Sequence, residues 1–109
     1  MNNLEIDVTI IENKGLRYTR AGIPVLEMLL ENYSKVIESG LERKIRFQIL
    51  SVAMGKITDN LIDMPMDYKF RAKGFIASAY RGSALLKFHL QEIIIHKQNI
   101  LDIQQHLYF

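Results

Sequence analysis

The 109-residue sequence has no cysteine, so it forms no disulfide and offers neither a catalytic thiolate nor a cysteine-based zinc site. It has only six glycines and two prolines, which excludes a Gly/Pro-rich low-complexity linker. No apolar run approaches the roughly eighteen residues that a membrane-spanning helix requires. The first residues also lack the basic segment and apolar stretch of a secretory signal. These absences together favour a cytoplasmic protein.

Side chains suited to catalysis are equally scarce. The three histidines, His89, His96 and His106, lack the i, i+4 spacing of a metal-binding helix. Gly55-Lys56 resembles the end of a phosphate-binding loop, but the earlier glycine and the following Ser or Thr of that motif are missing. No Ser-His-Asp arrangement is present. We therefore expect a protein that is not an enzyme and that holds no cofactor and no metal.

The composition is that of a single folded domain, because 49% of the residues are hydrophobic and the length suits one domain. The net charge of +2 is too small to indicate a polyanionic partner by itself. Between residues 69 and 97, however, six basic residues accompany a single acid. Such clustering produces a local positive field. The alternative is a soluble surface with uneven charge.

Alternating apolar and polar residues predict five β-strands, at residues 4–11, 25–33, 41–52, 68–80 and 85–96. The second segment also fits a helical stripe through Leu26, Leu29 and Leu30, so its pattern alone leaves strand and helix open. Turn residues at 12–15 begin a loop that runs to Gly22, and residues 34–40 form a second loop. Gly74, inside the fourth strand, predicts a bulge or a tight bend.

This outline is that of an OB-fold, a five-stranded barrel with a short helical segment, here residues 53–62, between strands three and four. The domain is expected to span residues 1–97. Residues 98–109 form a C-terminal tail, in which Ile100, Ile103 and Leu107 have the spacing of a short helix. A disordered terminus is the alternative.

Cations and aromatic rings recur together at three places in this outline. Single-stranded nucleic acid offers phosphates, which bind Lys and Arg, and exposed bases, which stack on rings and guanidinium planes. An OB-fold binds such strands on strands two and three, between the 1–2 and 4–5 loops. The clusters fall on the 1–2 loop, strand three and the 4–5 loop, and Tyr33 ends strand two: Arg17, Tyr18 and Arg20; Arg43, Lys44 and Arg46; Tyr80 and Arg81.

Each of these residues also has a structural alternative. The alternative for the two loop tyrosines, Tyr18 and Tyr80, is that they cap the ends of the barrel. Phe47 has the parity of the apolar residues on strand three and is assigned to the core. Lys44 and Arg46 have the opposite, outward parity, where they contact phosphate or simply solubilise the surface. Arg43 has core-side parity, but a bulge near the start of the strand would place its side chain in solvent.

Two motifs resemble a known family. The sequence RYTRAGIPVLEMLL (residues 17–30) resembles the segment after strand one of bacterial single-stranded-DNA-binding proteins. Together with KGFIASAY (residues 73–80), it is most similar to their primosomal members. The resemblance runs from about Leu4 to Lys97 and implies that residues 25–33 form a strand. Unlike many relatives, this chain has no tryptophan, no Gly/Gln/Pro-rich linker and no acidic tip.

The resemblance implies a homodimer that binds single-stranded DNA at stalled replication forks. It also implies contact with the restart helicase PriA and other primosome components, and help in loading the replicative helicase. Arg46 stands where some relatives carry tryptophan. The binding positions that the resemblance carries over are Arg17, Tyr18, Arg20, Tyr33, Arg43, Arg46, Tyr80, Arg81 and Lys87. The alternatives are a protein-bridging module with weak DNA contact, or a general single-stranded-DNA-binding protein without the acidic tail.

Overall fold

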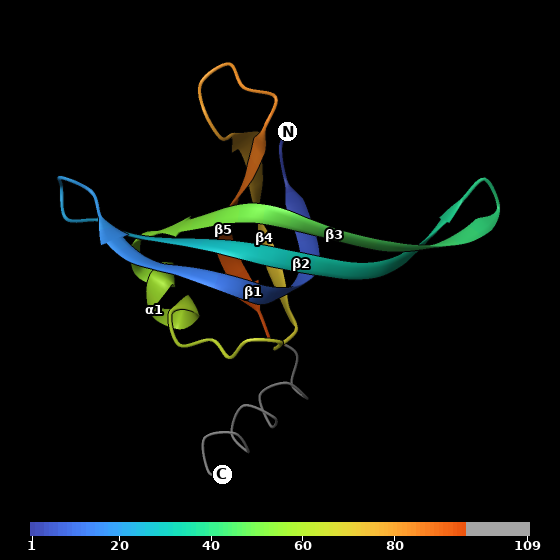
Figure 1. The fold of residues 1–109 in the computed structure, drawn as a ribbon, viewed down its shortest axis with the longest axis horizontal. Helices are drawn as coiled ribbons and strands as arrows, with labels where there is room; N and C mark the ends of the chain where they lie inside the picture. Colours follow the sequence, from blue (N-terminus) through green and yellow to red (C-terminus); the bar gives the residue numbers. More distant parts are fainter. Residues whose placement is uncertain (96–109) are drawn as a thin grey trace, which may run out of the picture.

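The computed structural model describes residues 1–95. Its five strands close into a barrel in the order β1-β2-β3-β5-β4 (Figure 1). The β3–β5 contact is parallel and every other strand pair is antiparallel. The predicted OB-fold is therefore confirmed, with strands β1 (Leu4–Tyr18), β2 (Pro24–Glu38), β3 (Leu41–Met54), β4 (Phe70–Ser78) and β5 (Leu86–Ile94). The tail 98–109, like His96, Lys97 and His106, lies outside the described residues.

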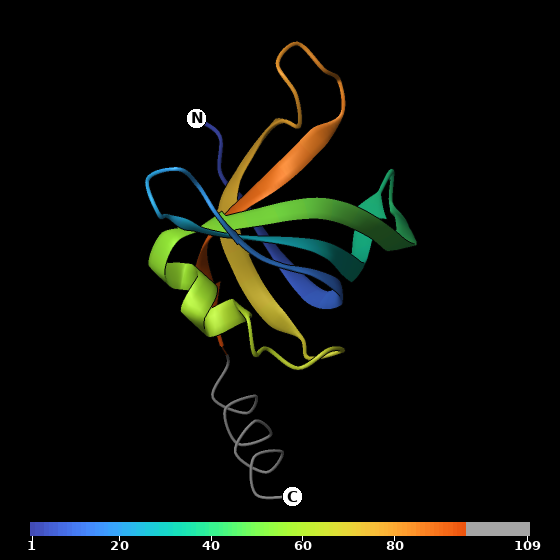
Figure 2. The same cartoon turned by 60° about the vertical axis from the view of Figure 1, so that its left-hand side comes forward.

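The barrel interior is filled by alternate residues of the strands, as the two-residue period requires. Phe70 and Phe88, on neighbouring strands β4 and β5, are fully buried at its centre. A 3₁₀ turn, η1 (Gly55–Ile57), and one helical turn, α1 (Thr58–Leu61), follow β3 and close one end of the barrel (Figure 2). Leu61 enters the core there and is fully buried. The predicted helical segment between strands three and four is thus present.

The predicted end of strand one at residue 11 is wrong, because β1 continues to Tyr18. Its pairing with β2 shifts register between Ile10 and Glu12 and again between Asn13 and Leu16. The turn-forming residues are absorbed as a bulge, in which Gly15 has a positive φ and donates its backbone N–H to the side chain of Asn13. The loop between strands one and two shortens to residues 19–23.

The predicted loop at residues 34–40 is also wrong. β2 runs on to Glu38, and only Ser39 and Gly40 separate it from β3. Both turn residues have positive φ, the backbone geometry of a two-residue hairpin turn. The β2–β3 ladder continues without a register shift to the last pair, Glu38 and Leu41. Beyond the barrel, the ladder therefore forms a two-stranded arm, residues 34–45, at the right of Figure 1.

The fourth and fifth strands are shorter than predicted, with bounds at residues 70–78 and 86–94. A bulge is present at this point of the β4–β5 ladder, but its extra residue is Gln91 on β5, because Lys73 pairs with Glu92 and Gly74 with Leu90. A Cβ at Gly74 would collide with the backbone carbonyl of His89 on β5, so only glycine lets the two strands approach this closely. The prediction that residues 25–33 form a strand, not a helix, is confirmed.

Candidate nucleic-acid interface

The outer face of β2 and β3 carries a cation–aromatic pair. Tyr33 and Arg46 lie directly opposite one another in the β2–β3 ladder. The guanidinium carbon of Arg46 lies 5.1 Å from the centre of the Tyr33 ring, within the range of a cation–π contact. Tyr33 is 54% exposed, and Arg46 is exposed beside it. The pair offers solvent an aromatic surface and a positive charge at the same point.

Glu31 holds this pair in place from the same face of β2. Its side chain is almost buried, and Oε2 accepts hydrogen bonds from Gln48 Nε2 at 3.1 Å and from Arg46 Nε at 3.4 Å. The hydrogen bond from Gln48 is the main cause that lowers the pKa of Glu31, and Tyr33 and Arg46 lower it further. Glu31 therefore stays ionised at neutral pH and fixes the direction of the guanidinium.

A second carboxylate gathers cations from two other strands. Glu27 Oε1 lies 3.0 Å from Arg17 Nη2 on β1 and 3.5 Å from Lys87 Nζ on β5. The hydrogen bond from Arg17 is the largest cause that lowers the pKa of Glu27, and the charge of Lys87 adds to it. Two predicted binding residues that are 70 positions apart, Arg17 and Lys87, are thereby brought to one point.

Neither Glu27 nor Glu31 was among the predicted site residues. Glu27 and Glu31 have the same outward parity as Tyr33 on β2, which is the only local signal for their position. Their contacts with β5 and β3 depend on long-range strand pairing that local patterns do not reveal. Each of them neutralises cations on the surface that was predicted to bind phosphate.

The remaining predicted site residues lie on three projections of the molecule: the β1–β2 loop, the arm and the β4–β5 loop. Tyr18 ends β1 instead of lying in a loop; it is 64% exposed and does not cap the barrel. Arg20 is exposed in the turn after it, which the Gly22-to-Thr19 backbone hydrogen bond closes. Tyr80 is 71% exposed in the β4–β5 loop, so it does not cap the barrel either, and Arg81 is exposed beside it.

The predicted cations of β3 lie on the arm. Arg43 is exposed, and its Nη1 lies 2.6 Å from Glu38 Oε1 across the hairpin. Lys44 is exposed opposite Lys35 in the ladder. No bulge displaces Arg43, since the β2–β3 register is regular there; it reaches solvent because the arm has left the barrel.

The three projections point in different directions. In Figure 1 the β1–β2 loop and the tip of the arm lie at opposite ends of the β2–β3 ribbon, and the β4–β5 loop rises near its middle. The structure therefore unites Tyr33 with Arg46 and Arg17 with Lys87, while the other predicted residues stand apart. A ligand that met all of them would have to be long and flexible, as a single strand of nucleic acid is.

The assignment of Phe47 to the core is wrong. Its inward parity is correct, but it pairs with Asn32 at the point where the arm leaves the barrel, and 38% of its surface is exposed. It lines an open hollow with Asn32, Ser34 and Arg71. Local alternation gives the side of the sheet on which a residue lies, but it does not show where the barrel ends.

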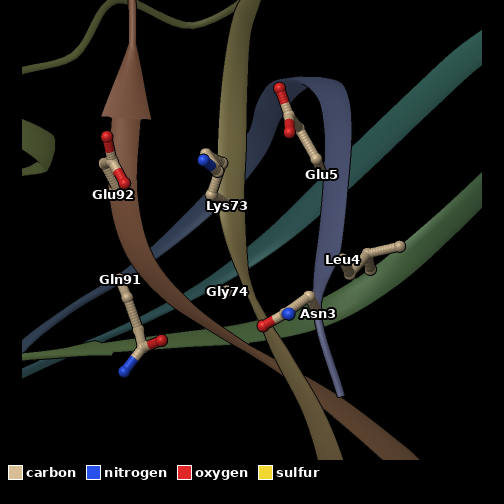
Figure 3. Close-up of a pocket in the computed structure, with 7 residues that line it drawn as sticks. All are labelled: Asn3, Leu4, Glu5, Lys73, Gly74, Gln91 and Glu92. Carbon is tan, nitrogen blue, oxygen red and sulfur yellow. The ribbon is translucent and has the colours of Figure 1, made fainter. Parts of the chain in front are cut away.

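The basic residues of β4 lie beside carboxylates. Arg71 makes two hydrogen bonds to the carboxylate of Asp7, with Nε 2.9 Å from Oδ1. Lys73 stands opposite Glu5 on β1 and Glu92 on β5, and the three side chains line a hollow without any aromatic residue (Figure 3). This hollow has mixed charge and no ring on which a base could stack, so we do not assign nucleic acid to it.

Within residues 1–95, no three His, Cys, Asp or Glu side chains form a group able to hold a metal ion. Among those same residues, no helix is long and apolar enough to cross a membrane.

Comparison with known proteins assigns the family. A model described as "Another single-strand binding protein family" matches residues 2–92. The replication restart protein PriB of Bordetella pertussis is 38% identical over 92 residues, which cover 84% of this chain and 86% of that protein. PriB of Nitrosomonas europaea is 30% identical over 91 residues, 84% of each chain. The chain belongs to the PriB family of single-strand binding proteins.

Solved structures agree with this assignment. The structure of PriB from Ralstonia solanacearum is 27% identical and has a TM-score of 0.79, covering 88% of this chain and 98% of that one. The single-strand binding domain of a Synechococcus protein has a TM-score of 0.63 over 87% of this chain and 96% of that one. Its 16% identity supports the fold alone. The resemblance drawn from residues 17–30 and 73–80 is thereby confirmed for the PriB family.

Proposed function

We propose that this protein is a non-enzymatic single-stranded-DNA-binding component of the replication restart primosome in the cytoplasm. The observation that carries the proposal is the Tyr33–Arg46 pair, an exposed ring and cation on the outer face of β2 and β3. Arg17 and Lys87 extend the positive surface along the same side of the barrel. Family membership supports the pathway, because the curated relatives are named replication restart proteins.

When a strand binds to this surface, the cations of the protein would exchange their carboxylate partners for phosphates of the DNA. Arg46 would move from Glu31 to the DNA backbone while Tyr33 stacks on a base, a contact worth about 1–3 kcal/mol. Arg17 and Lys87 would bind further phosphates, and the predicted cations Arg20, Arg43, Lys44 and Arg81 would guide the strand at its ends. Tyr18 and Tyr80 are the other predicted stacking residues.

Titration of a fluorescently labelled oligo-dT, followed by anisotropy across a salt series, tests this proposal. With the phosphate contacts of Arg46, Arg17 and Lys87, log K should fall against log salt with a slope of about −2. The double substitution Tyr33→Ala/Arg46→Ala should weaken binding about 10- to 100-fold, the cost of one stacked base and one phosphate contact. Asn60→Ala, an exposed change on α1, is the control and should bind normally. Absence of binding at low salt would overturn the proposal.

The proposal includes two assembly partners. We infer a homodimer and a contact with the restart helicase PriA, both carried by kinship with the PriB family. Binding of purified PriA, measured by biolayer interferometry with and without oligo-dT, checks the second partner. No association in either condition would remove PriA from the proposal and leave the DNA-binding role standing.

A second candidate function is bridging between the helicase and its loader, with weak DNA contact. Two observations favour it: Glu27 and Glu31 neutralise part of the binding face, and the arm exposes apolar residues, Ile37 and Leu41, at its tip. The triple substitution of Arg17, Arg46 and Arg81 by alanine separates the two functions. If helicase stimulation survives when DNA binding is lost, bridging is the main role.

A further inference from the structure

Two rings stack on the outer wall of β4 and β5, away from the Tyr33–Arg46 pair. Phe75 and His89 are partners in the β4–β5 ladder, and their ring centres lie 4.6 Å apart with an angle of 9° between the planes. Their neighbours Phe88 and Leu90 point into the core and are buried. The stacked pair therefore lies outside the barrel, where both side chains remain partly exposed.

A shallow hollow adjoins this pair. Phe75 and His89 form part of its lining, Val52, Met54 and Ile57 add apolar surface, and Gln91 contributes an amide. Met54 is 50% exposed, so its flexible side chain can adapt to a flat ligand. Stacked rings, an adaptable apolar wall and one amide together suit a planar heterocycle with hydrogen-bonding edges.

This wall is continuous with the proposed DNA surface. Val52 at the end of β3 pairs with His89 on β5, and Glu27 on β2 pairs with Val52 on its other side. Lys87 precedes His89 by two residues, so both have the same outward parity on β5. At about 3.3 Å per residue, Arg46 and Val52 are about 20 Å apart along β3. One strand could therefore run from the Tyr33–Arg46 pair past Lys87 to the stacked rings.

The charge state of His89 fits stacking better than phosphate binding. Burial lowers its pKa, and the neighbouring charge of Lys87 lowers it further. The imidazole is therefore neutral at neutral pH, and it offers a ring face while Lys87 supplies the positive charge. The two residues divide the roles that Tyr33 and Arg46 have at the other end of the face.

We propose that Phe75 and His89 form a second base-stacking site, which binds one nucleobase of the same single strand while Lys87 binds an adjoining phosphate. The inference rests on the proposed DNA-binding function. It extends the path of the strand from β2–β3 across the end of β3 onto the wall of β4–β5.

The absence of native tryptophan allows a direct test. Phe75→Trp places a lone tryptophan in a chain that has none, and a stacked thymine quenches its fluorescence. Oligo-dT of increasing length is titrated, with anisotropy of a label reporting binding and tryptophan emission reporting stacking. Phe47→Trp is the matched control, because Phe47 is a partly exposed aromatic residue that lines a different hollow.

We expect strong quenching of the introduced tryptophan at position 75, only with oligonucleotides long enough to span both sites, and none at position 47. Phe75→Leu and His89→Ala, chosen to limit the effect on packing, should each weaken binding of long oligonucleotides about 5- to 100-fold while short ones bind as before. Binding without quenching at position 75 would overturn the inference and leave the proposed function intact. No binding by any variant or by the unmodified protein would overturn both.

Discussion

Glu31 is an almost buried carboxylate on a surface proposed to bind phosphate. It holds Arg46 by an ion pair that a bound strand would have to break. Because Arg46 is largely exposed, solvent screens this ion pair, and the need to break it should lower the affinity for a strand by a factor of up to about five.

Replacing Glu31 by glutamine should therefore strengthen binding of single-stranded DNA. Glu31→Gln keeps a hydrogen-bond acceptor for Gln48 but removes the charge, so Arg46 becomes available to phosphate. We expect the affinity to rise about two- to fivefold, because the ion pair no longer has to be broken. Anisotropy at fixed salt measures this change. Asp63→Asn removes the same charge from an exposed position after α1 and is the control. An equal rise in both variants would show a general charge effect.

His89 predicts a pH dependence of folding stability. Its pKa is lowered in the folded state, so the unfolded chain binds more protons between that lowered pKa and the ordinary value of about 6.5. Stability should therefore fall as the pH falls below about 6.5. Thermal melting at pH 7.5 and 5.5 checks this, with His89→Gln as the comparison. If the variant loses as much stability as the unmodified protein, His89 is not the group responsible.

Some features of the strands could be predicted from the sequence and others could not. Parity placed Arg46 and Lys44 on the outer face correctly, and it also gave the inward side for Phe47. The pairing of Tyr33 with Arg46 was missed because residues 34–40 were interpreted as a loop. With a two-residue turn at Ser39-Gly40 the register follows by counting, so the missing information was the turn type, not the strands.

Other features of the site could not be predicted from local patterns. The contact of Glu27 with Lys87 joins β2 to β5, and it exists only because β5 returns beside β3 to close the barrel. The bulge in β1 was interpreted as a turn because Asn13 and Gly15 suit both structures equally well. What decides between them is the pairing of the following residues with β2, a contact at long range.

The close approach of the β5 backbone makes Gly74 difficult to replace. Gly74→Ala would drive a methyl group into the backbone of β5 at His89, and overpacking of this kind costs about 1–3 kcal/mol or more. For a domain of this size, 1 kcal/mol lowers the melting temperature by about 4–8 °C. Gly40→Ala is the matched control, since only its positive φ opposes the change. Equal losses in the two variants would show that the close strand approach is unimportant.

The arm should be separable from the barrel. Its residues beyond Tyr33 are largely exposed and contribute nothing to the main core cluster. Replacing residues 37–42 by Asn-Gly, which keeps a two-residue turn, should change the free energy of unfolding by less than about 1 kcal/mol, the scale of exposed positions. Urea unfolding measures this change. A loss of several kcal/mol would mean that the arm packs on something that stabilises the fold.

At the scale of the whole molecule, we expect a homodimer. The exposed apolar side chains of the arm, among them Val36, Ile37 and Leu41, are the kind of surface that association buries. Light scattering should then give a mass of about twice the 12.7 kDa of the chain. The arm-shortened variant, run at the same concentration, shows whether these side chains contribute. A monomer at every concentration would contradict the expectation for the unmodified protein.

The carboxylates beside the cations also have a kinetic consequence. Arg46, Arg17 and Lys87 each have a glutamate within 4 Å, so each cation regains a partner as soon as a phosphate leaves it. A strand can then dissociate one contact at a time, without a step that leaves several charges uncompensated. Such a surface would release DNA quickly, so that the next protein can bind it, which suits a factor that binds a strand only briefly.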